Sequence, residues 1–339
     1  MNSALLSATD LKAQIQQHLS ADLQGVNQII EQSLHSPSSF VANVLEHVSR
    51  YRGKQIRPIL LLLMNRMVAG TATRKGQTLA AAIEMIHMAT LVHDDVIDEA
   101  ETRRHVATVH RRWNTETSVL LGDFLFSRAF HLSATTGDPS ACVLIGKATD
   151  RICEGELNQI AARLEGSNSE VDYFRIVRGK TGQLFALSCQ LGVASAGGSA
   201  EECKAAWRFG VRLGTAFQIA DDALDVTQSL ESTGKDAGND LKNGRRTLPV
   251  LRALQTGATD SSTVAQDELR ILNEWLRGER LVAPTEFRQI GLMQRGVQSA
   301  LDTAEQLVGR AIRDLRSFAQ STDRQILEAI AGYAVRREN

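Results

Sequence analysis

The sequence predicts an all-α protein, and three features of its pattern support this. Residues 8–34 place apolar side chains at helical spacing, at Leu11, Ile15, Leu19, Leu23, Val26 and Ile30. Runs that alternate apolar and polar residues are scarce, so we expect no strands. The five prolines lie near expected element boundaries, at Pro37, Pro58, Pro139, Pro249 and Pro284. We therefore expect one helical domain over residues 1–339, a single-domain bundle around a large central cavity.

The predicted helices follow one another along the chain, separated by loops where Gly, Ser, Thr and Asp concentrate. We expect these loops at residues 70–76, 134–139, 165–169, 195–200, 229–247 and 256–261. Two of the apolar helical runs, residues 84–92 and 211–219, each lead directly into a cluster of acidic residues. These two clusters are the most informative features of the chain.

Each cluster has the pattern D-D-x-x-D, from Asp94 to Asp98 and from Asp221 to Asp225. Residues four apart share a helix face, so each pair of outer carboxylates lies together, and like charges at that spacing repel. Carboxylates without nearby Cys or paired His suit Mg²⁺, which usually binds through one or two carboxylates and substrate phosphates. One copy alone is equally explained as an Asp-rich helix end. Two copies in the same apolar context predict facing metal-binding motifs, with these ligands: Asp94, Asp95, Asp98, Asp221, Asp222 and Asp225.

Basic residues beside Gly recur close to both acidic motifs. They occur in residues 52–58, 103–104, 179–182, 234–240 and 244–249. Arg offers a planar fork to phosphate oxygens, and Lys a point charge. Each basic residue taken singly is best explained as a solvated surface charge. Residues 179–182 lack the first Gly and the preceding strand of a phosphate-binding loop. Only their co-occurrence with the acidic motifs predicts a site for a Mg²⁺-bridged diphosphate.

In this order the motifs resemble those of the trans (E-type) isoprenyl diphosphate synthases, or polyprenyl synthetases. The match runs from Lys54 to Arg337 and so covers nearly the whole chain. The resemblance implies a trans-prenyltransferase that condenses isopentenyl diphosphate with an allylic prenyl diphosphate, using three Mg²⁺ ions. Pyrophosphate leaves the allylic substrate, the alkene attacks the resulting cation, and a proton is lost. The resemblance also implies a homodimer.

The resemblance assigns roles to matching positions. Lys54, Arg57, His87 and Arg104 bind isopentenyl diphosphate. Arg103, Lys180, Thr181, Gln218 and Lys235 bind the allylic diphosphate, with Arg245 where a Lys is typical. Asp94, Asp98 and Asp221 hold Mg²⁺ directly. Asp95, Asp222 and Asp225 bind Mg²⁺ through water or support the direct ligands without touching the ion. The catalytic set is Asp94, Asp98, Asp221, Arg103, Lys180 and Lys235. Two departures from the family pattern are Arg52 and His105, each in place of a Gly. Taken without the family, His87 is better explained as a core histidine.

Product length in this family is limited by bulky residues four or five positions before the first Asp. Here these are the small residues Thr90 and Ala89, with Ala82 two turns deeper and Met85 as a partial floor. We therefore expect a long-chain polyprenyl product, longer than farnesyl, and a Phe at position 89 to shorten it. Geranylgeranyl diphosphate is the shorter alternative. The competing explanation of Ala89 is close packing against a neighbouring helix.

Three other functions compete with this prediction. A class I terpene cyclase normally carries a different second metal motif, with Asn and Ser or Thr. A non-catalytic synthase subunit is expected to have lost acidic residues, whereas both motifs here are complete. A purely structural helical protein leaves the carboxylates unexplained.

The global composition fits an enzyme of the reduced cytoplasm. Lys+Arg 38 against Asp+Glu 39 gives a net charge of -1, which argues against nucleic-acid binding. The four cysteines show no C-x-x-C spacing, so neither zinc nor disulfides are indicated. No apolar run approaches the length of a membrane span, and we expect at most a transient membrane contact during product release.

Overall fold

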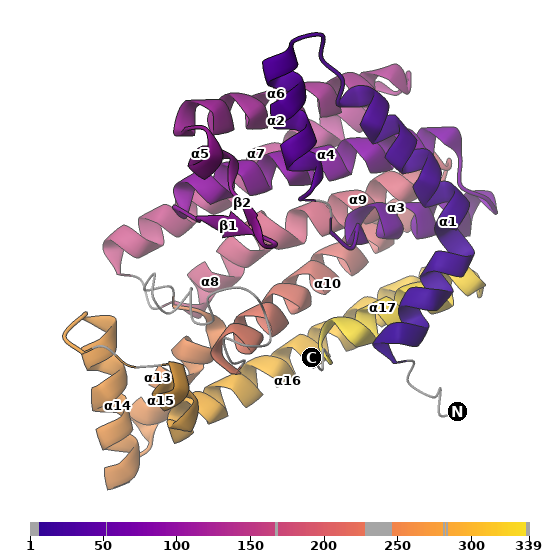
Figure 1. Ribbon diagram of the computed structural model, residues 1–339. Helices are drawn as coiled ribbons and strands as arrows, with labels where there is room; N and C mark the ends of the chain where they lie inside the picture. The colour runs from indigo at the N-terminus through magenta and orange to yellow at the C-terminus, as the bar shows by residue number, and fades with distance from the viewer. Residues whose placement is uncertain are drawn as a thin grey trace. The chain divides into compact units, whose positions relative to one another are not determined.

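The computed structural model describes residues 7–51, 53–166, 169–227, 246–280, 282 and 284–336. These residues are almost entirely helical, which confirms the predicted all-α class (Figure 1). Contacts between residues divide the chain into two compact units. Unit 1 consists of Met1–Thr149, Leu184–Gly210 and Asp314–Ile330, and unit 2 of Asp150–Gln183, Val211–Arg313 and Ala331–Asn339. The single domain and the central cavity stay predictions.

Unit 1 is built around α4 (Arg74–Ile97), which contacts α1, α3 and α6. Its other elements are α1 (Ala8–Ser33), α2 (Ser39–Ser49), α3 (Ile56–Ala69), β1 (Thr102–Arg103), β2 (Val106–Ala107), α5 (Val109–Arg112), α6 (Thr115–Thr135), α9 (Gln183–Ser195) and a 3₁₀ turn, η2 (Leu315–Ser317). The first residue of α9 belongs to unit 2. Helix starts follow local capping: the side chains of Ser7, Ser38, Thr73 and Asn114 accept hydrogen bonds from backbone N–H groups of α1, α2, α4 and α6.

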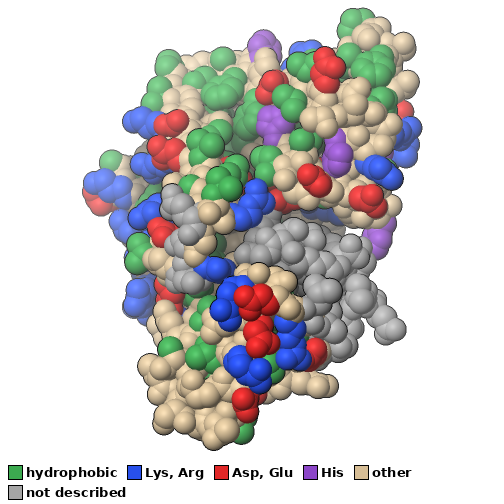
Figure 2. Space-filling view, turned by 90° about the vertical axis from the view of Figure 1, so that its left-hand side faces the viewer, with side chains coloured by type: hydrophobic (Ala, Val, Ile, Leu, Met, Phe, Trp, Pro, Cys, Tyr) green, Lys and Arg blue, Asp and Glu red, His purple; other side chains and the backbone are tan. Residues whose placement is uncertain are grey.

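Unit 2 contains α8 (Glu170–Val177), a π-helical turn η1 (Arg178–Gly182), α13 (Leu248–Thr259), α14 (Thr263–Leu276), α15 (Pro284–Gln289) and most of α16 (Gly291–Asp314). The helices α7 (Pro139–Glu165), α10 (Ala200–Thr227) and α17 (Thr322–Ala334) contribute residues to both units. The core of unit 2 includes the fully buried Phe287. Its ring packs edge-on against Trp275, with the two ring centroids 4.7 Å apart. On the face shown in Figure 2, acidic and basic side chains are interleaved.

One short hairpin departs from the expectation that the chain has no strands. Thr102 pairs with Ala107 and Arg103 with Val106 in an antiparallel ladder. The connecting residues Arg104 and His105 have φ angles of 51° and 63°. Two successive left-handed residues form the tight turn whose twist suits a two-residue hairpin. Strands of two residues are too short for an alternating pattern to reveal.

The predicted helix over residues 8–34 is confirmed by α1, while some loops are shorter than expected. The helix α4 begins inside the predicted loop 70–76, and α13 extends to Thr259, inside the predicted loop 256–261. Most of the predicted loop 229–247 lies outside the described residues. Within the described ranges, no helix has both the length and the apolar character that a membrane crossing requires.

Candidate active site

The first acidic motif forms the last turn of α4 in unit 1. Asp94 and Asp98 are partly exposed, and the backbone N–H of Asp98 donates to Asp94 O at 2.8 Å, so the helical turn continues through both residues. Asp95 is only 1% exposed. The two outer carboxylates of the motif therefore remain accessible, while the middle one is turned into the unit.

Asp95 is held by Arg103 from the hairpin. Arg103 Nε donates to Asp95 Oδ1 at 2.7 Å, and Nη2 lies 2.6 Å from the same oxygen. Burial raises the pKa of Asp95, and the hydrogen bond and charge of Arg103 oppose that rise. Among the described residues, the other oxygen, Asp95 Oδ2, has no hydrogen-bond partner. Arg103 thus supports the acidic motif before any substrate binds.

A group of cations surrounds His87 in the same unit. Burial first, and then the charges of Arg57, Arg104 and Arg103, hold the pKa of His87 well below its usual range, so the imidazole is neutral near pH 7. Burial also lowers the pKa of Arg57 to about 10, with a further lowering by Arg104 that Glu84 opposes. Gathering arginines at this density is costly without an anion, and a diphosphate is a suitable one.

Gly53 makes room for one of these arginines. The Arg104 guanidinium lies so close to Gly53 that a Cβ atom there would collide with it, and Arg104 Nη1 donates to Tyr51 O. The next residue, Lys54, is exposed. The structure therefore brings Arg57, His87 and Arg104 of the predicted isopentenyl diphosphate site into one neighbourhood.

The second acidic motif lies near the end of α10 in unit 2. Asp221 is exposed and Asp225 partly exposed, while Asp222 is only 4% exposed. Tyr173 Oη donates to Asp222 Oδ2 at 2.6 Å, and Gln218 Nε2 donates to Asp222 Oδ1 at 2.8 Å. As in the first motif, the middle carboxylate is turned inward and held by its own unit.

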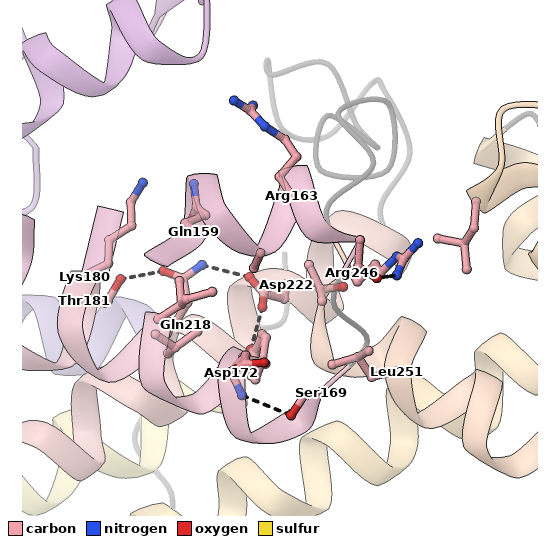
Figure 3. A pocket seen from close by; sticks show the side chains of 17 residues that line it. Gln159, Arg163, Ser169, Asp172, Lys180, Thr181, Gln218, Asp222, Arg246 and Leu251 are labelled. Atoms are coloured by element: carbon pink, nitrogen blue, oxygen red, sulfur yellow. Dashed lines mark hydrogen bonds between the residues drawn. The ribbon is translucent and has the colours of Figure 1, made fainter. Parts of the chain in front are cut away.

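A cavity of about 340 Å³ adjoins this motif within unit 2. Predicted site residues Lys180, Thr181, Gln218 and Asp222 line it (Figure 3). The same wall carries Tyr173, Gln159, Arg163 and Arg246, and its apolar part includes Ile176, Val177, Leu251 and Leu276. In Figure 3 the side chains of Lys180, Gln159 and Arg163 extend in the same direction. The cavity combines cations, hydrogen-bonding groups and an apolar wall.

Lys180 and Thr181 lie on the π-helical turn η1, a feature often found at functional sites. Glycines allow this turn to approach its neighbours. A Cβ atom on Gly155 of α7 would lie 2.9 Å from the Lys180 backbone nitrogen, and one on Gly182 would lie 3.2 Å from Val211 Cγ2. No sequence pattern marks this π-helical turn, because residues 179–182 resemble only a weak and incomplete phosphate-binding loop.

Two residues of this site were missed by sequence reasoning. Glu156 of α7 forms a 2.7 Å ion pair with Lys180, and Tyr173 of α8 holds Asp222. Neither belongs to a Gly-flanked basic element or an acidic motif. The local signal for Glu156 is the neighbouring Gly155, where the absence of a Cβ atom lets the backbone of α7 approach Lys180.

The donor set fits Mg²⁺. Among the described residues, no group of three His, Cys, Asp or Glu side chains is close enough to form a metal cage by itself. Mg²⁺ does not require one, because it binds through one or two carboxylates and completes its shell with phosphates and water. Asp94 with Asp98, and Asp221 with Asp225, each offer two accessible carboxylates one helical turn apart. That the two motifs face each other stays a prediction.

The four predicted chain-length residues divide between two faces of α4. Thr90 shares the face of His87 and Asp94, and its hydroxyl donates to His87 O at 2.9 Å. Ala82, Met85 and Ala89 are completely buried. They share a face with His93, whose Nε2 is 3.1 Å from Val119 O of α6. The buried face therefore points toward α6, which favours the packing explanation for Ala89.

Three residues of the sequence-based analysis lie outside the described residues: Arg52, Lys235 and Arg245. Their predicted roles stay predictions.

Comparison with known proteins identifies the family. The Polyprenyl synthetase family model matches residues 38–274. This chain belongs to the polyprenyl synthetase family. It is 36% identical to an all-trans-nonaprenyl-diphosphate synthase (geranyl-diphosphate specific) of Rhodobacter capsulatus, over 97% of this chain and 99% of that protein. It is 34% identical to the octaprenyl diphosphate synthase of Escherichia coli, over 94% and 96%.

Solved structures of other polyprenyl synthetases share the fold. A polyprenyl synthase from Caulobacter crescentus, complexed with calcium and isoprenyl diphosphate, matches with a TM-score of 0.85 and 34% identity over 96% of this chain and 98% of that chain. A decaprenyl diphosphate synthase from Rhodobacter capsulatus matches with a TM-score of 0.85 and 30% identity, over 96% and 100%. The family likeness thus extends over nearly the full length of both chains.

Proposed function

We propose that this protein is a trans-prenyltransferase that adds isopentenyl diphosphate to an allylic prenyl diphosphate and makes an all-trans polyprenyl diphosphate longer than farnesyl. One observation carries this proposal: this member of the polyprenyl synthetase family has both acidic motifs, each with accessible outer carboxylates and with basic residues nearby. The long-chain synthases to which it is similar support the long product.

The two substrates divide between two sets of residues. Isopentenyl diphosphate binds at Lys54, Arg57, His87 and Arg104, where clustered arginines supply charge and the neutral imidazole supplies a hydrogen bond. The allylic diphosphate binds beside Lys180, Thr181 and Gln218, with Arg103, Lys235 and Arg245 as further cations. Lys180 must exchange its ion pair with Glu156 for one with phosphate when this substrate binds.

Mg²⁺ would be held by Asp94, Asp98 and Asp221, and we propose three ions. Asp95, Asp222 and Asp225 would bind these ions through water or support the direct ligands. When bound, Mg²⁺ neutralises charge that develops on the departing pyrophosphate. Lys180 and Arg103 orient the leaving group and add to that neutralisation. The apolar wall of the cavity excludes water, which would otherwise trap the allylic cation.

The remaining proposals concern product length, assembly and location. The small side chain of Thr90 leaves room for the growing prenyl chain on the face of α4 that carries Asp94. Ala82, Met85 and Ala89, on the buried face of α4, also limit the length of that chain. The functional form is a homodimer in the cytoplasm, with at most a transient membrane contact during product release.

A chain-elongation assay tests the function. Purified protein is incubated with Mg²⁺, labelled isopentenyl diphosphate and geranyl or farnesyl diphosphate, and the products are dephosphorylated and separated by chain length. All-trans products longer than farnesyl are expected. A product that stops at geranylgeranyl would reassign the enzyme to the class of a Pyrococcus horikoshii structure that is 29% identical, with a TM-score of 0.78. Cyclic hydrocarbon would indicate a terpene cyclase, and no turnover a regulatory subunit.

A further inference from the structure

In unit 1, the C-terminal end of α2 contacts the β1–β2 hairpin at one carbonyl oxygen. His47 Nε2 lies 2.7 Å from Ala107 O, and Tyr51 Oη donates to the same oxygen at 3.2 Å. The next hairpin residue, Thr108, donates its backbone N–H to Glu101 O at 3.0 Å. Hydrogen-bonded pairs alternate along an antiparallel ladder, so the Ala107 carbonyl points away from β1. Two side chains from the end of α2 therefore hold strand β2.

The two partners of His47 fix the position of its proton. A carbonyl oxygen only accepts, so Nε2 carries the proton and donates it to Ala107 O. On the other side of the ring, Arg112 Nη1 lies 2.7 Å from Nδ1 and can only donate. Burial lowers the pKa of His47, the hydrogen bond to Ala107 opposes that shift, and the charges of Arg112 and Arg50 add to it. The imidazole is therefore neutral near pH 7, and its one N–H donor is directed at the hairpin.

Aromatic contacts hold the imidazole ring in one orientation. His47 is only 3% exposed, and its ring packs edge-on against Tyr51 and Trp113, with ring centroids 5.8 and 5.1 Å apart. The Arg112 guanidinium lies over the Trp113 ring, with its carbon 4.7 Å from the ring centroid. The donor to Ala107 O is therefore held in place before any substrate binds.

The same end of α2 also anchors Arg104, which lies in the hairpin turn. Arg104 Nη1 donates to the backbone oxygen of Tyr51. A guanidinium has five N–H donors, so Arg104 keeps others for a diphosphate. Arg103, the neighbouring hairpin arginine, is held separately by Asp95, at 2.7 and 2.6 Å. A movement of β2 away from α2 would therefore displace Arg104 more than Arg103.

We propose that His47 is a positioning residue for isopentenyl diphosphate: it holds β2 against the end of α2 and so keeps Arg104 in place for the diphosphate. The inference rests on the proposed function, and it extends that site to a residue outside every acidic and basic motif. Loss of the His47 donor should weaken the binding of isopentenyl diphosphate selectively. The allylic diphosphate should bind as before, because its proposed cations are Lys180 and the independently held Arg103.

Steady-state kinetics with each substrate varied in turn test this role. His47→Leu removes the donor and keeps a side chain that can fill the buried position. We expect H47L to raise the KM for isopentenyl diphosphate by about threefold to tenfold, the effect of one lost hydrogen bond. The kcat and the KM for geranyl diphosphate should stay within about twofold of wild type, because only the binding of one substrate is weakened. Equal increases in both KM values, or an unchanged KM for isopentenyl diphosphate, would overturn the proposal.

Two comparisons separate positioning from a purely structural role. His47→Gln is the conservative variant, because the Gln amide nitrogen can donate to Ala107 O from about the position of His Nε2. H47Q should recover most of the lost affinity, and an H47Q protein as impaired as H47L would contradict the proposal. In an Arg104→Gln background, H47L should have little further effect on the KM for isopentenyl diphosphate, because connected residues are non-additive. Additive effects would show that His47 does not act through Arg104.

A control and a second variant keep the test decisive. His35→Leu changes an exposed histidine of the same unit and should leave both KM values unchanged. If H47L does not fold, Tyr51→Phe removes the other donor to Ala107 O, and a selective rise in the KM for isopentenyl diphosphate decides in the same way. A wild-type protein that elongates no prenyl diphosphate would refute the proposed function. An active wild type with an unselective H47L refutes only the role of His47.

Discussion

Arg103 Nη2 lies 2.6 Å from Asp95 Oδ1, and this ion pair connects the β1–β2 hairpin to the last turn of α4. The corresponding residue of the second motif, Asp222, is held instead by two neutral donors, Tyr173 and Gln218. In both motifs the middle carboxylate is buried and held within its own unit. The outer carboxylates are partly or fully exposed, so each motif has one buried and two accessible acidic positions.

Replacing Arg103 should therefore destabilise the fold as well as the activity. Arg103→Gln leaves the buried carboxylate of Asp95 without its cation, and we expect the free energy of unfolding to fall by about 2–4 kcal/mol. Adding Asp95→Asn to Arg103→Gln should recover part of that lost stability. The measurement is urea denaturation. Arg270→Gln is the matched control, because Arg270 is exposed and pairs with the exposed Asp267, and such surface pairs contribute at most about 1 kcal/mol. Equal losses in both variants would contradict the structural role of the pair.

Stability should also depend on the protonation of His87. An unfolded His takes up a proton as the pH falls below about 6.5, while the low pKa of the folded His87 keeps it neutral. The contribution of neutral His87 to the free energy of unfolding is therefore fully present above pH 6.5. It is lost as the pH falls further, by up to about 2 kcal/mol at pH 5. Urea denaturation at the two pH values should show a smaller loss for His87→Gln than for wild type. An identical pH dependence would mean that folding does not lower the pKa of His87.

The Lys180–Glu156 ion pair makes a prediction about substrate affinity. Glu156 is partly buried beside Lys180, so its negative charge opposes an arriving diphosphate. Glu156→Gln should lower the KM for the allylic substrate by about threefold to tenfold, while Lys180→Gln should raise it and lower kcat by about 10²-fold. Steady-state kinetics with varied allylic diphosphate distinguish the two. If E156Q weakens binding as K180Q does, the role of Glu156 is to hold Lys180 in place.

His105 occupies a left-handed backbone position in the hairpin turn, with a φ of 63°. Such a conformation is strained for a residue with a side chain, by about 1 kcal/mol, and costs Gly nothing. His105→Gly should thus raise the free energy of unfolding by about 0.5–1 kcal/mol. His131→Gly, inside α6 near its C-terminal end, should lower it by up to about 1 kcal/mol. A loss of stability in both variants would show that the side chain of His105 is required.

Product length should respond differently at two neighbouring positions of α4. Thr90→Phe projects a ring on the face of Asp94 and is expected to shorten the product with turnover retained. Ala89→Phe inserts a ring into a fully buried position on the side of α6, where overpacking costs about 1–3 kcal/mol. Chain-length analysis together with thermal melting separates these effects. A shortened product from a stable A89F protein would show instead that Ala89 limits product length.

The sequence was sufficient for features that depend on local pattern. The helix of α1 and the placement of both acidic motifs on apolar helices followed from spacing alone. The hairpin could not be predicted because its strands have two residues, and the turn at Arg104 and His105 uses neither Gly nor Asn. The partners of Lys180 and Asp222 are 24 and 49 residues away along the chain, in Glu156 and Tyr173, and nothing local marks such pairs.

We propose that both acidic motifs together hold Mg²⁺ and the allylic diphosphate. The most direct measurement is the Mg²⁺-dependent binding of an unreactive thiolo analogue of geranyl diphosphate to wild type, Asp94→Ala, Asp221→Ala and the double variant, with the exposed Asp302→Ala as control. Either single variant should remove Mg²⁺-dependent tight binding, and the double variant should bind no worse than either one. Independent, additive losses, or tight binding that survives in D94A or D221A, would contradict it.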